Sequence, residues 1–190
     1  MNDNFQPVEA ADSLSALDIE LLSHLDRLVF SNRESHDQLT AAYKEAELVL
    51  NDIQNTLPYS CQEVNIADFK KHLPEHLREH VNLCRVFLLK QGYRLSVPEV
   101  HRNSVQRLVS FKNNGAIHIA KTDSADMTFR KFELASTGDD GSRELRHRWN
   151  IVPANTWHFP EASSLGDWCT VTFHSASSAE IIDEDWIEEL

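Results

Sequence analysis

Residues 101–121 read HRNSVQRLVSFKNNGAIHIAK, and this stretch decides the fold class. Its segments 106–112 and 116–121 are short and rich in Val, Ile and Phe, and an Asn-Asn-Gly turn signal lies between them at 113–115. This is the pattern of two antiparallel strands joined by a turn. Segments of the same kind are CRVFLLKQ (84–91), TFRKFELA (128–135), WNIVP (149–153) and WCTVTFHS (168–175). The chain from residue 83 onward therefore predicts an antiparallel sandwich or barrel.

The chain before residue 83 has helical periodicity instead. Leucines recur at helical spacing between 14 and 28, and a second apolar face runs from 39 to 53 with Ser31 or Asn32 as its cap. A third helical piece covers about 66–81, and Pro74 interrupts it. We expect an α+β protein in three parts: an acidic arm and helical segment at 1–82, a β-barrel at 83–176, and an acidic tail at 177–190. In the tail we expect a short helix that docks Ile181, Trp186 and Leu190.

The bulk composition narrows the functional classes. The chain has 190 residues, a hydrophobic content of 41% and a formal net charge of −12, which argues for a folded core and against nucleic acid as a partner. Apolar runs such as VFLL at 86–89 are too short to span a membrane, and no signal peptide pattern is present. The three cysteines form no CxxC pair, which argues against a disulfide framework. We therefore expect a cytoplasmic protein that binds no membrane.

The charge is unevenly distributed along the chain. Residues 83–148 carry 12 Lys/Arg against 7 Asp/Glu, a balance of +5, whereas the segments on either side are strongly acidic. A positively charged central segment is suited to binding a small anionic ligand such as a carboxylate. The alternative is that these are surface charges that pair with the acidic flanks.

Three of the ten histidines lie in HLPEHLREH at helical spacing: His72, His76 and His80. His76, Glu79 and His80 match the H-x-x-E-H pattern of inverted zinc proteases. Pro74 disturbs a helix at this point, and no third ligand is identifiable. A solvated helix face explains this motif better than a zinc site does.

Two other stretches resemble the motifs of the cupin superfamily. The first cupin motif is His, any residue, His, four residues, Glu, six residues, Gly, and His101, Asn103, Leu108 and Gly115 fall on those positions. The second is Pro, any residue, Gly, two residues, His, three residues, Asn, and Pro153, Asn155, His158 and Ala162 fall on those positions. The spacing is kept in both, while several ligand positions are replaced. The resemblance implies helices packed on a cupin-like double-stranded β-helix, with His101 and His158 together at its mouth.

Within that superfamily the chain looks most like the thiol dioxygenases, of which cysteine dioxygenase is the type. They use three histidines and no motif Glu, so Leu108 alone does not exclude the class. TVTFHS places Thr170, Thr172 and His174 on the family's Ser-x-His-x-Tyr-Ser segment, with one residue deleted. Arg85 is nearest to where these enzymes hold a substrate carboxylate.

Two functions stay open at this point. In the first, His101 and His158 bind one metal, Fe(II) or another divalent ion, with Asn103, Gln106 or His174 as third ligand. Arg85 then binds a small anionic or thiol substrate, and His174 or Thr172 orients it for reaction with O₂. In the second, the metal site is lost, and the cupin barrel is a non-catalytic module that binds a small ligand or a protein partner. A homodimer through the helical half is compatible with either.

Overall fold

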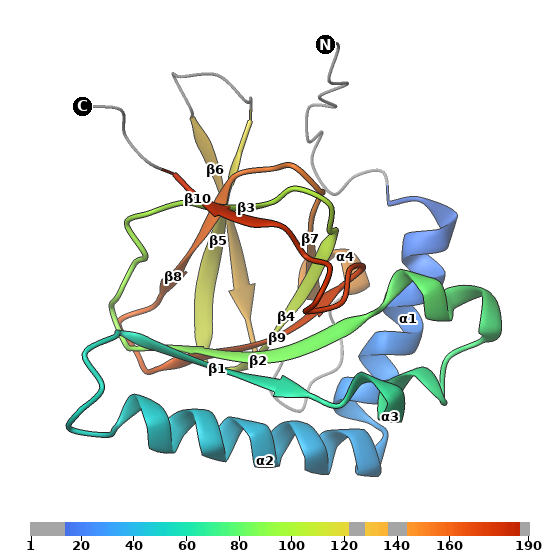
Figure 1. Ribbon diagram of the computed structural model, residues 1–190, viewed down its shortest axis with the longest axis horizontal. Coiled ribbons are helices and arrows are strands. Elements are labelled where there is room, and N and C mark those ends of the chain that lie inside the picture. Colours follow the sequence, from blue (N-terminus) through green and yellow to red (C-terminus); the bar gives the residue numbers. More distant parts are fainter. Residues whose placement is uncertain (1–13, 122–127, 137–143, 187–190) are drawn as a thin grey trace.

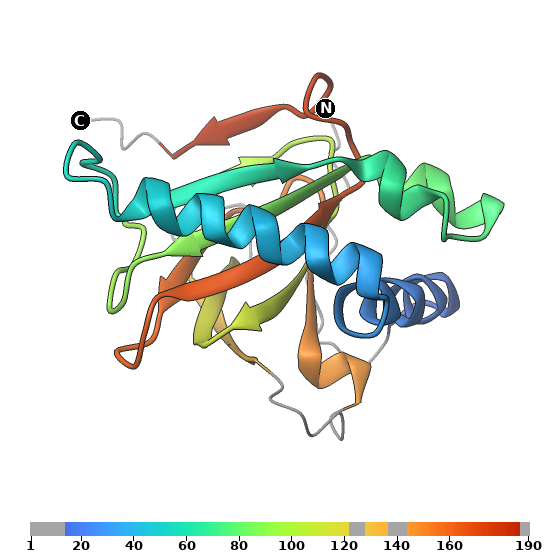
Figure 2. The same cartoon turned by 90° about the horizontal axis from the view of Figure 1, so that it is seen from below.

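The computed structural model describes residues 14–121, 128–136 and 144–186, and it shows two antiparallel sheets with the long helices along one side (Figures 1 and 2). The predicted arm at 1–12, the turn signal at 137–142 and Leu190 lie outside these ranges. The described residues confirm the α+β class with a cupin-like, jelly-roll arrangement. The two sheets face each other but do not close into one continuous barrel.

Helices α1 (Ala16–Phe30) and α2 (Arg33–Leu50) form where the leucine periodicity predicts them. The Asn32 side chain caps α2 by accepting a hydrogen bond from the Ser35 backbone N–H, which satisfies a free donor of the first turn. Helix α2 ends at Leu50, three residues short of the predicted Ile53, whose side chain is exposed. The inward faces of both helices cover the outer face of the first sheet.

The third helical piece divides at Pro74, as predicted. Helix α3 (Ile66–Lys70) precedes the proline, and the 3-10 helix η2 (Glu75–His80) follows it. Because a 3-10 helix repeats every three residues, His76 and His80 do not share a face as they would in an α-helix. A further short helix, α4 (Leu145–Arg148), precedes the seventh strand.

The first sheet has the strand order β1-β2-β9-β4-β7. Its strands are β1 (Tyr59–Val64), β2 (Leu83–Leu89), β9 (Trp168–His174), β4 (Gln106–Lys112) and β7 (Trp149–Val152). Strand β9 is buried on both faces: Cys169, Val171 and Phe173 pack in the core under the helices, while the alternate residues face the other sheet. That inward set is Trp168, Thr170, Thr172 and His174, and three of its four members are polar.

The second sheet has the strand order β10-β3-β8-β5-β6. Its strands are β10 (Asp183–Asp185), β3 (Glu99–His101), β8 (His158–Ala162), β5 (Asn114–Ala120) and β6 (Phe129–Ala135). Strand β5 joins β4 through Asn113, whose φ of 57° gives the left-handed turn. Gly115 follows, and a side chain there would overlap the ring of Trp168, so glycine permits the close approach of the two sheets.

Two predictions about local structure are wrong. Residues 59–64 form strand β1, not helix or linker, because Tyr59–Val64 pairs along its whole length with β2. Residues 183–185 form strand β10, not part of a short helix, because the tail finds an unpaired neighbour in β3. In both cases an available sheet edge overrides the weak local preference of the segment.

Candidate metal centre

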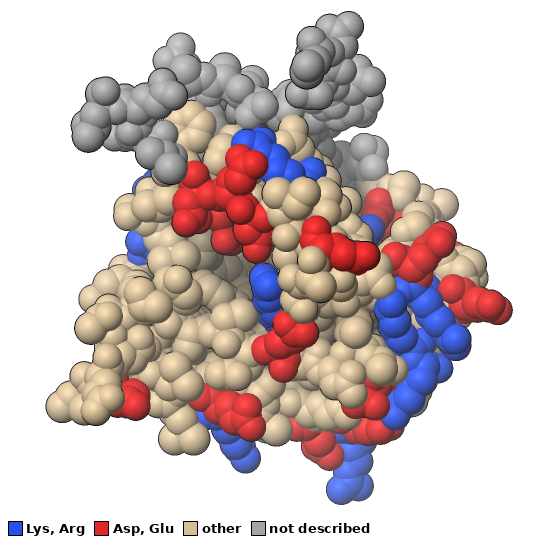
Figure 3. All heavy atoms as spheres, in the orientation of Figure 1, with Lys and Arg blue, Asp and Glu red and all other residues tan. Residues whose placement is uncertain are grey.

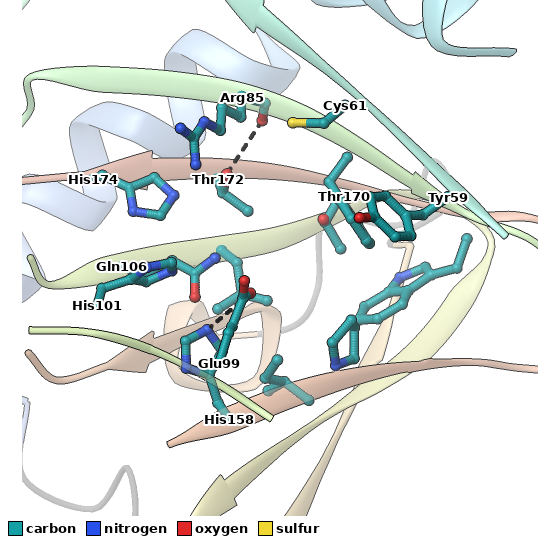
Figure 4. Close-up of a pocket in the computed structure, with 15 residues that line it drawn as sticks. Tyr59, Cys61, Arg85, Glu99, His101, Gln106, His158, Thr170, Thr172 and His174 are labelled. Carbon is teal, nitrogen blue, oxygen red and sulfur yellow. Dashed lines mark hydrogen bonds and ion pairs between the residues drawn. The ribbon is translucent and has the colours of Figure 1, made fainter. Parts of the chain in front are cut away.

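A cavity of about 180 Å³ lies between the two sheets, and it has one polar and one apolar end. Figure 4 shows Glu99, His101, Gln106 and His158 at one end and Tyr59 and Cys61 at the other. The remaining lining residues are Arg85, Phe87, Leu108, Ile117, Pro160, Trp168, Thr170, Thr172 and His174. The cavity therefore brings together six of the seven residues that the sequence singled out for these roles: His101, His158, His174, Gln106, Thr172 and Arg85.

His101 and His158 present the same ring nitrogen to the cavity. The Nδ1 of His101 lies 2.6 Å from a carboxylate oxygen of Asp183, and the Nδ1 of His158 lies 3.0 Å from the backbone oxygen of Thr156. Both partners are acceptors, so each Nδ1 donates the hydrogen bond, and the neutral form of each ring has its lone pair on Nε2. Both Nε2 atoms are buried with no hydrogen-bond partner, and the two ring centroids are 5.0 Å apart. This is how protein histidines are prepared for a metal ion.

Glu99 completes a group of three potential ligands. Its carboxylate lies 3.5 Å from the Nε2 of His158, and the ligand atoms of Glu99, His101 and His158 all lie within 4.8 Å of one another. No other set of three His, Cys, Asp or Glu side chains in the described part of the chain meets that condition. Burial raises the pKa of Glu99, but the contact with the His158 ring and the nearby His101 and Arg85 outweigh it and lower the pKa. The Glu99 carboxylate is therefore an anionic donor.

His174 and Gln106 lie beside this group. The ring of His174 is 4.9 Å from that of His101, and its Nδ1 is buried without a partner, as is the Oε1 of Gln106. Four buried polar atoms thus point into one cavity with no protein partner. Burial, together with the nearby His101 ring and the Arg85 guanidinium, holds the pKa of His174 well below its usual range. Burial and the neighbouring His158 also lower the pKa of His101. Both rings are neutral at pH 7 and able to donate a lone pair.

Asn103 is the predicted ligand that the structure places elsewhere. Its side chain is exposed, donates to the backbone oxygen of Glu180 at 2.8 Å and accepts from the backbone N–H of Ile182 at 2.9 Å. Both ends of its amide are therefore used by the C-terminal segment. Strand β3 ends at His101 and residues 102–103 form a turn, so the alternation that brings Glu99 and His101 to the cavity does not continue to Asn103.

The first cupin-like motif consequently lies two residues earlier than its sequence register indicated. Glu99, His101, Gln106 and Asn113 have the same spacing as His, His, Glu and Gly in that motif. The first three line the cavity, and Asn113 takes the left-handed conformation expected of the glycine. In the second motif the spacing predicted from sequence holds, since Asn155 has a φ of 59° and delivers His158 to the cavity. Sequence reasoning missed Glu99 as a candidate ligand because it required a histidine at the first position.

Arg85 and Thr172 are directly opposite each other on neighbouring strands β2 and β9. The Thr172 hydroxyl donates to the backbone oxygen of Arg85 at 3.4 Å (Figure 4). The Arg85 guanidinium lines the cavity and forms no hydrogen bond or ion pair with another described residue. A guanidinium without a described partner, in the cavity that His174 also lines, has the charge and the geometry to bind an anion.

Comparison with known proteins agrees with the fold but does not identify the chain. No protein-family model matches the sequence, and a search of curated proteins finds no relative. Among solved structures, oxalate oxidase in complex with glycolate matches with 11% identity over 68% of this chain, at a TM-score of 0.48. Hazelnut (Corylus avellana) vicilin matches with 12% identity over 73% of this chain, at a TM-score of 0.47.

These matches span only part of the proteins concerned. This chain covers 56% of the oxalate oxidase chain and 34% of the vicilin chain. Oxalate decarboxylase from Bacillus subtilis, described with Mn(II) centres, matches with 10% identity at a TM-score of 0.47, and this chain covers 29% of it. At TM-scores below 0.5 such matches carry no argument about metal or substrate.

No described helix is long and apolar enough to cross a membrane.

Proposed function

We propose that the protein is a metal-dependent oxidoreductase that uses one divalent ion, preferably Fe(II), bound by Glu99, His101 and His158. The observation that carries the proposal is the convergence in one cavity of a carboxylate and two buried Nε2 atoms that have no hydrogen-bond partner. Two histidines and one carboxylate are the donor set of non-haem Fe(II) oxygenases, which leaves coordination positions open. When bound, Fe(II) supplies those open positions for a substrate atom and for O₂.

The substrate that fits the cavity best is a small anion with a short apolar body. Arg85 offers the bidentate geometry that binds a carboxylate, and no other described residue forms a hydrogen bond or ion pair with it. The other wall is apolar and includes Phe87, Leu108 and Trp168. The only polar atom of the Trp168 side chain, Nε1, already donates to the Ser110 hydroxyl at 3.0 Å, so the ring presents only apolar surface. A thiol or hydroxyl next to the carboxylate would reach the ligand end of the cavity.

His174 is the residue best placed to orient that substrate. It is neutral, lies against His101, and shares the inward face of β9 with Thr172. Thr172 uses its hydroxyl on the β2 backbone, so it positions Arg85 more than it contacts substrate. Tyr59, Phe87 and Trp168 exclude water from the remaining walls, which strengthens each polar contact inside.

The alternative of a non-catalytic barrel rested on the replacement of two ligand positions by Asn103 and Leu108. With the motif counted from Glu99, His101 and Gln106 occupy the corresponding positions, and both line the cavity. Asn103 and Leu108 therefore give no support to a lost metal site.

The test is metal content together with O₂ consumption. Wild type, His158→Ala and the control His76→Ala are each reconstituted anaerobically with Fe(II) and desalted, and the iron content per chain is measured. The ring of His76 lies outside the cavity, so it serves as the control. We expect one ion in wild type and in His76→Ala and almost none in His158→Ala. An oxygen electrode then screens small thiol and hydroxy carboxylates. Sub-stoichiometric iron in wild type that His158→Ala leaves unchanged would sink the proposal.

A further inference from the structure

The C-terminal segment returns to the candidate metal centre after leaving it. The chain exits β9 directly after His174, and residues 175–186, which we call the C-terminal strap, cross from the first sheet to the outer edge of the second (Figure 1). There β10 pairs with β3, the strand that carries Glu99 and His101. Acidic side chains gather over this edge in Figure 3, where β10 contributes Asp183, Glu184 and Asp185.

The strap is attached to its neighbours by more than strand pairing. Asn103 holds the strap backbone on both sides of Ile181 through its two amide hydrogen bonds. Arg102 donates to one carboxylate oxygen of Glu184 from two nitrogens, at 2.6 and 3.0 Å. The ring of Trp186 packs edge-on against that of Trp157, with centroids 5.2 Å apart. A three-residue strand on a sheet edge gains a fixed position from these contacts.

That fixed position brings the Asp183 carboxylate to the ring of His101. The two residues are opposite each other in the register of β10 and β3, and the carboxylate accepts from the His101 Nδ1–H at 2.6 Å. The Asp183 side chain is 43% exposed, whereas that of His101 is 4% exposed, so Asp183 approaches the ring from the outside. A neutral imidazole donates from one nitrogen and accepts at the other, so this contact directs the free lone pair of Nε2 into the cavity.

We propose that the C-terminal strap is a positioning element of the metal centre, in which Asp183 fixes the ring orientation and the Nε2-ligating tautomer of His101. This inference rests on the proposed function. His158 receives the same support from the backbone oxygen of Thr156, only two residues away. His101 instead depends on a segment 82 residues further along the chain. The strap thus couples the order of the C-terminus to the affinity of the site for metal.

The test compares three variants on the same strand, with Co(II) alone as the probe. Asp183→Leu removes the acceptor, and Asp183→Asn keeps an acceptor oxygen without the charge. Asp185→Asn removes the same charge from a side chain that forms no hydrogen bond or ion pair with another described residue. Outer-shell partners of ligating histidines are typically worth about 10- to 100-fold in metal affinity. We expect a loss of that size in Asp183→Leu, a loss below about 10-fold in Asp183→Asn, and wild-type affinity in Asp185→Asn.

The second readout is the tautomer of His101 in the metal-free protein, measured from its ring ¹⁵N shifts. We expect the Nδ1–H form in wild type, Asp183→Asn and Asp185→Asn, and a mixture of tautomers in Asp183→Leu. Wild-type Co(II) affinity and an unchanged tautomer in Asp183→Leu would overturn the positioning role while leaving the proposed function intact. If wild type binds no Co(II), the proposed function fails, and the tautomer alone then decides the role of Asp183.

Discussion

Two groups of histidines in this protein have the same spacing to carboxylates but opposite surroundings. In the exposed group, His72, His76 and His80 lie 3.5, 3.1 and 3.6 Å from glutamates. In the cavity group, His158 lies 3.5 Å from Glu99. The side chains of the first group are 32%, 61% and 33% exposed, whereas that of His158 is 1% exposed.

The difference shows that burial and convergence, not pairing with a carboxylate, mark a candidate ligand. An exposed pair is surrounded by water and gains little from its contact. In the cavity, two further rings lie against His101, and the free nitrogens have no protein partner. A buried lone pair without a partner is costly, and a bound cation offsets that cost.

The largest expected effect is on metal affinity when the carboxylate of each group is removed. Glu99→Ala deletes the anionic donor of the cavity, so we expect Fe(II) and Co(II) affinity to fall by more than about 100-fold, beyond the range of outer-shell changes. Glu20→Ala removes the partner of His76 and leaves affinity unchanged. Isothermal titration calorimetry measures both. Equal losses in the two variants would erase the distinction between the groups.

A second effect is stabilisation of the fold by metal. An ion that binds only the folded state at 100 times its Kd adds about 2.7 kcal/mol to the free energy of unfolding. Urea unfolding with and without Co(II) should show this gain in wild type and in His80→Ala, but not in His101→Ala. A gain that persists in His101→Ala would assign the metal to another part of the molecule.

The third effect is the pH dependence of stability in the metal-free protein. Burial puts the pKa of His174 in the folded state below the unfolded value of about 6.5. The unfolded chain then binds more protons below pH 6.5, so stability falls as the pH drops from there toward the folded pKa. Replacing His174 with Leu should flatten this fall, measured by chemical denaturation between pH 7 and 5. His76→Ala, at an exposed position, should keep the wild-type slope, and a wild-type slope in His174→Leu would contradict the burial argument.

The smallest effect concerns stability at neutral pH. Exposed ion pairs contribute about 0–1 kcal/mol, so His76→Ala should change the free energy of unfolding by less than that. Thermal or urea denaturation is sufficient to measure it. A loss of several kcal/mol would mean that the His76–Glu20 contact holds η2 on α1 as a structural element.

The strands that the sequence predicts are those whose own residues favour the strand conformation. Segments 106–112 and 149–152 alternate residues between two buried faces. They form β4 and β7, and β7 lacks only the last residue of the predicted segment 149–153. Strands β1, β3, β8 and β10 were not predicted, because each is short or polar and exists through pairing with a distant partner. Local sequence carries little of that information.

Only part of the candidate site could likewise be predicted from the sequence. His101 and His158 followed from motif spacing, and His174 from its neighbours on β9. Glu99 has a plain sequence signal, since it is two residues before His101 and seven before Gln106, but that signal is visible only if a glutamate is allowed in a histidine position. The role of Asp183 depends on a strand pairing between residues 82 apart, which no local pattern reveals.

The most direct test is anomalous X-ray diffraction at the metal edge from crystals of the protein loaded with Co(II) or Fe(II). We predict one peak per chain, bonded to the Nε2 atoms of His101 and His158 and to a carboxylate oxygen of Glu99, at about 2.0–2.2 Å, distances typical of nitrogen and oxygen ligands to such ions. A peak at His72, His76 or His80 with an empty cavity would contradict the assignment of the metal centre.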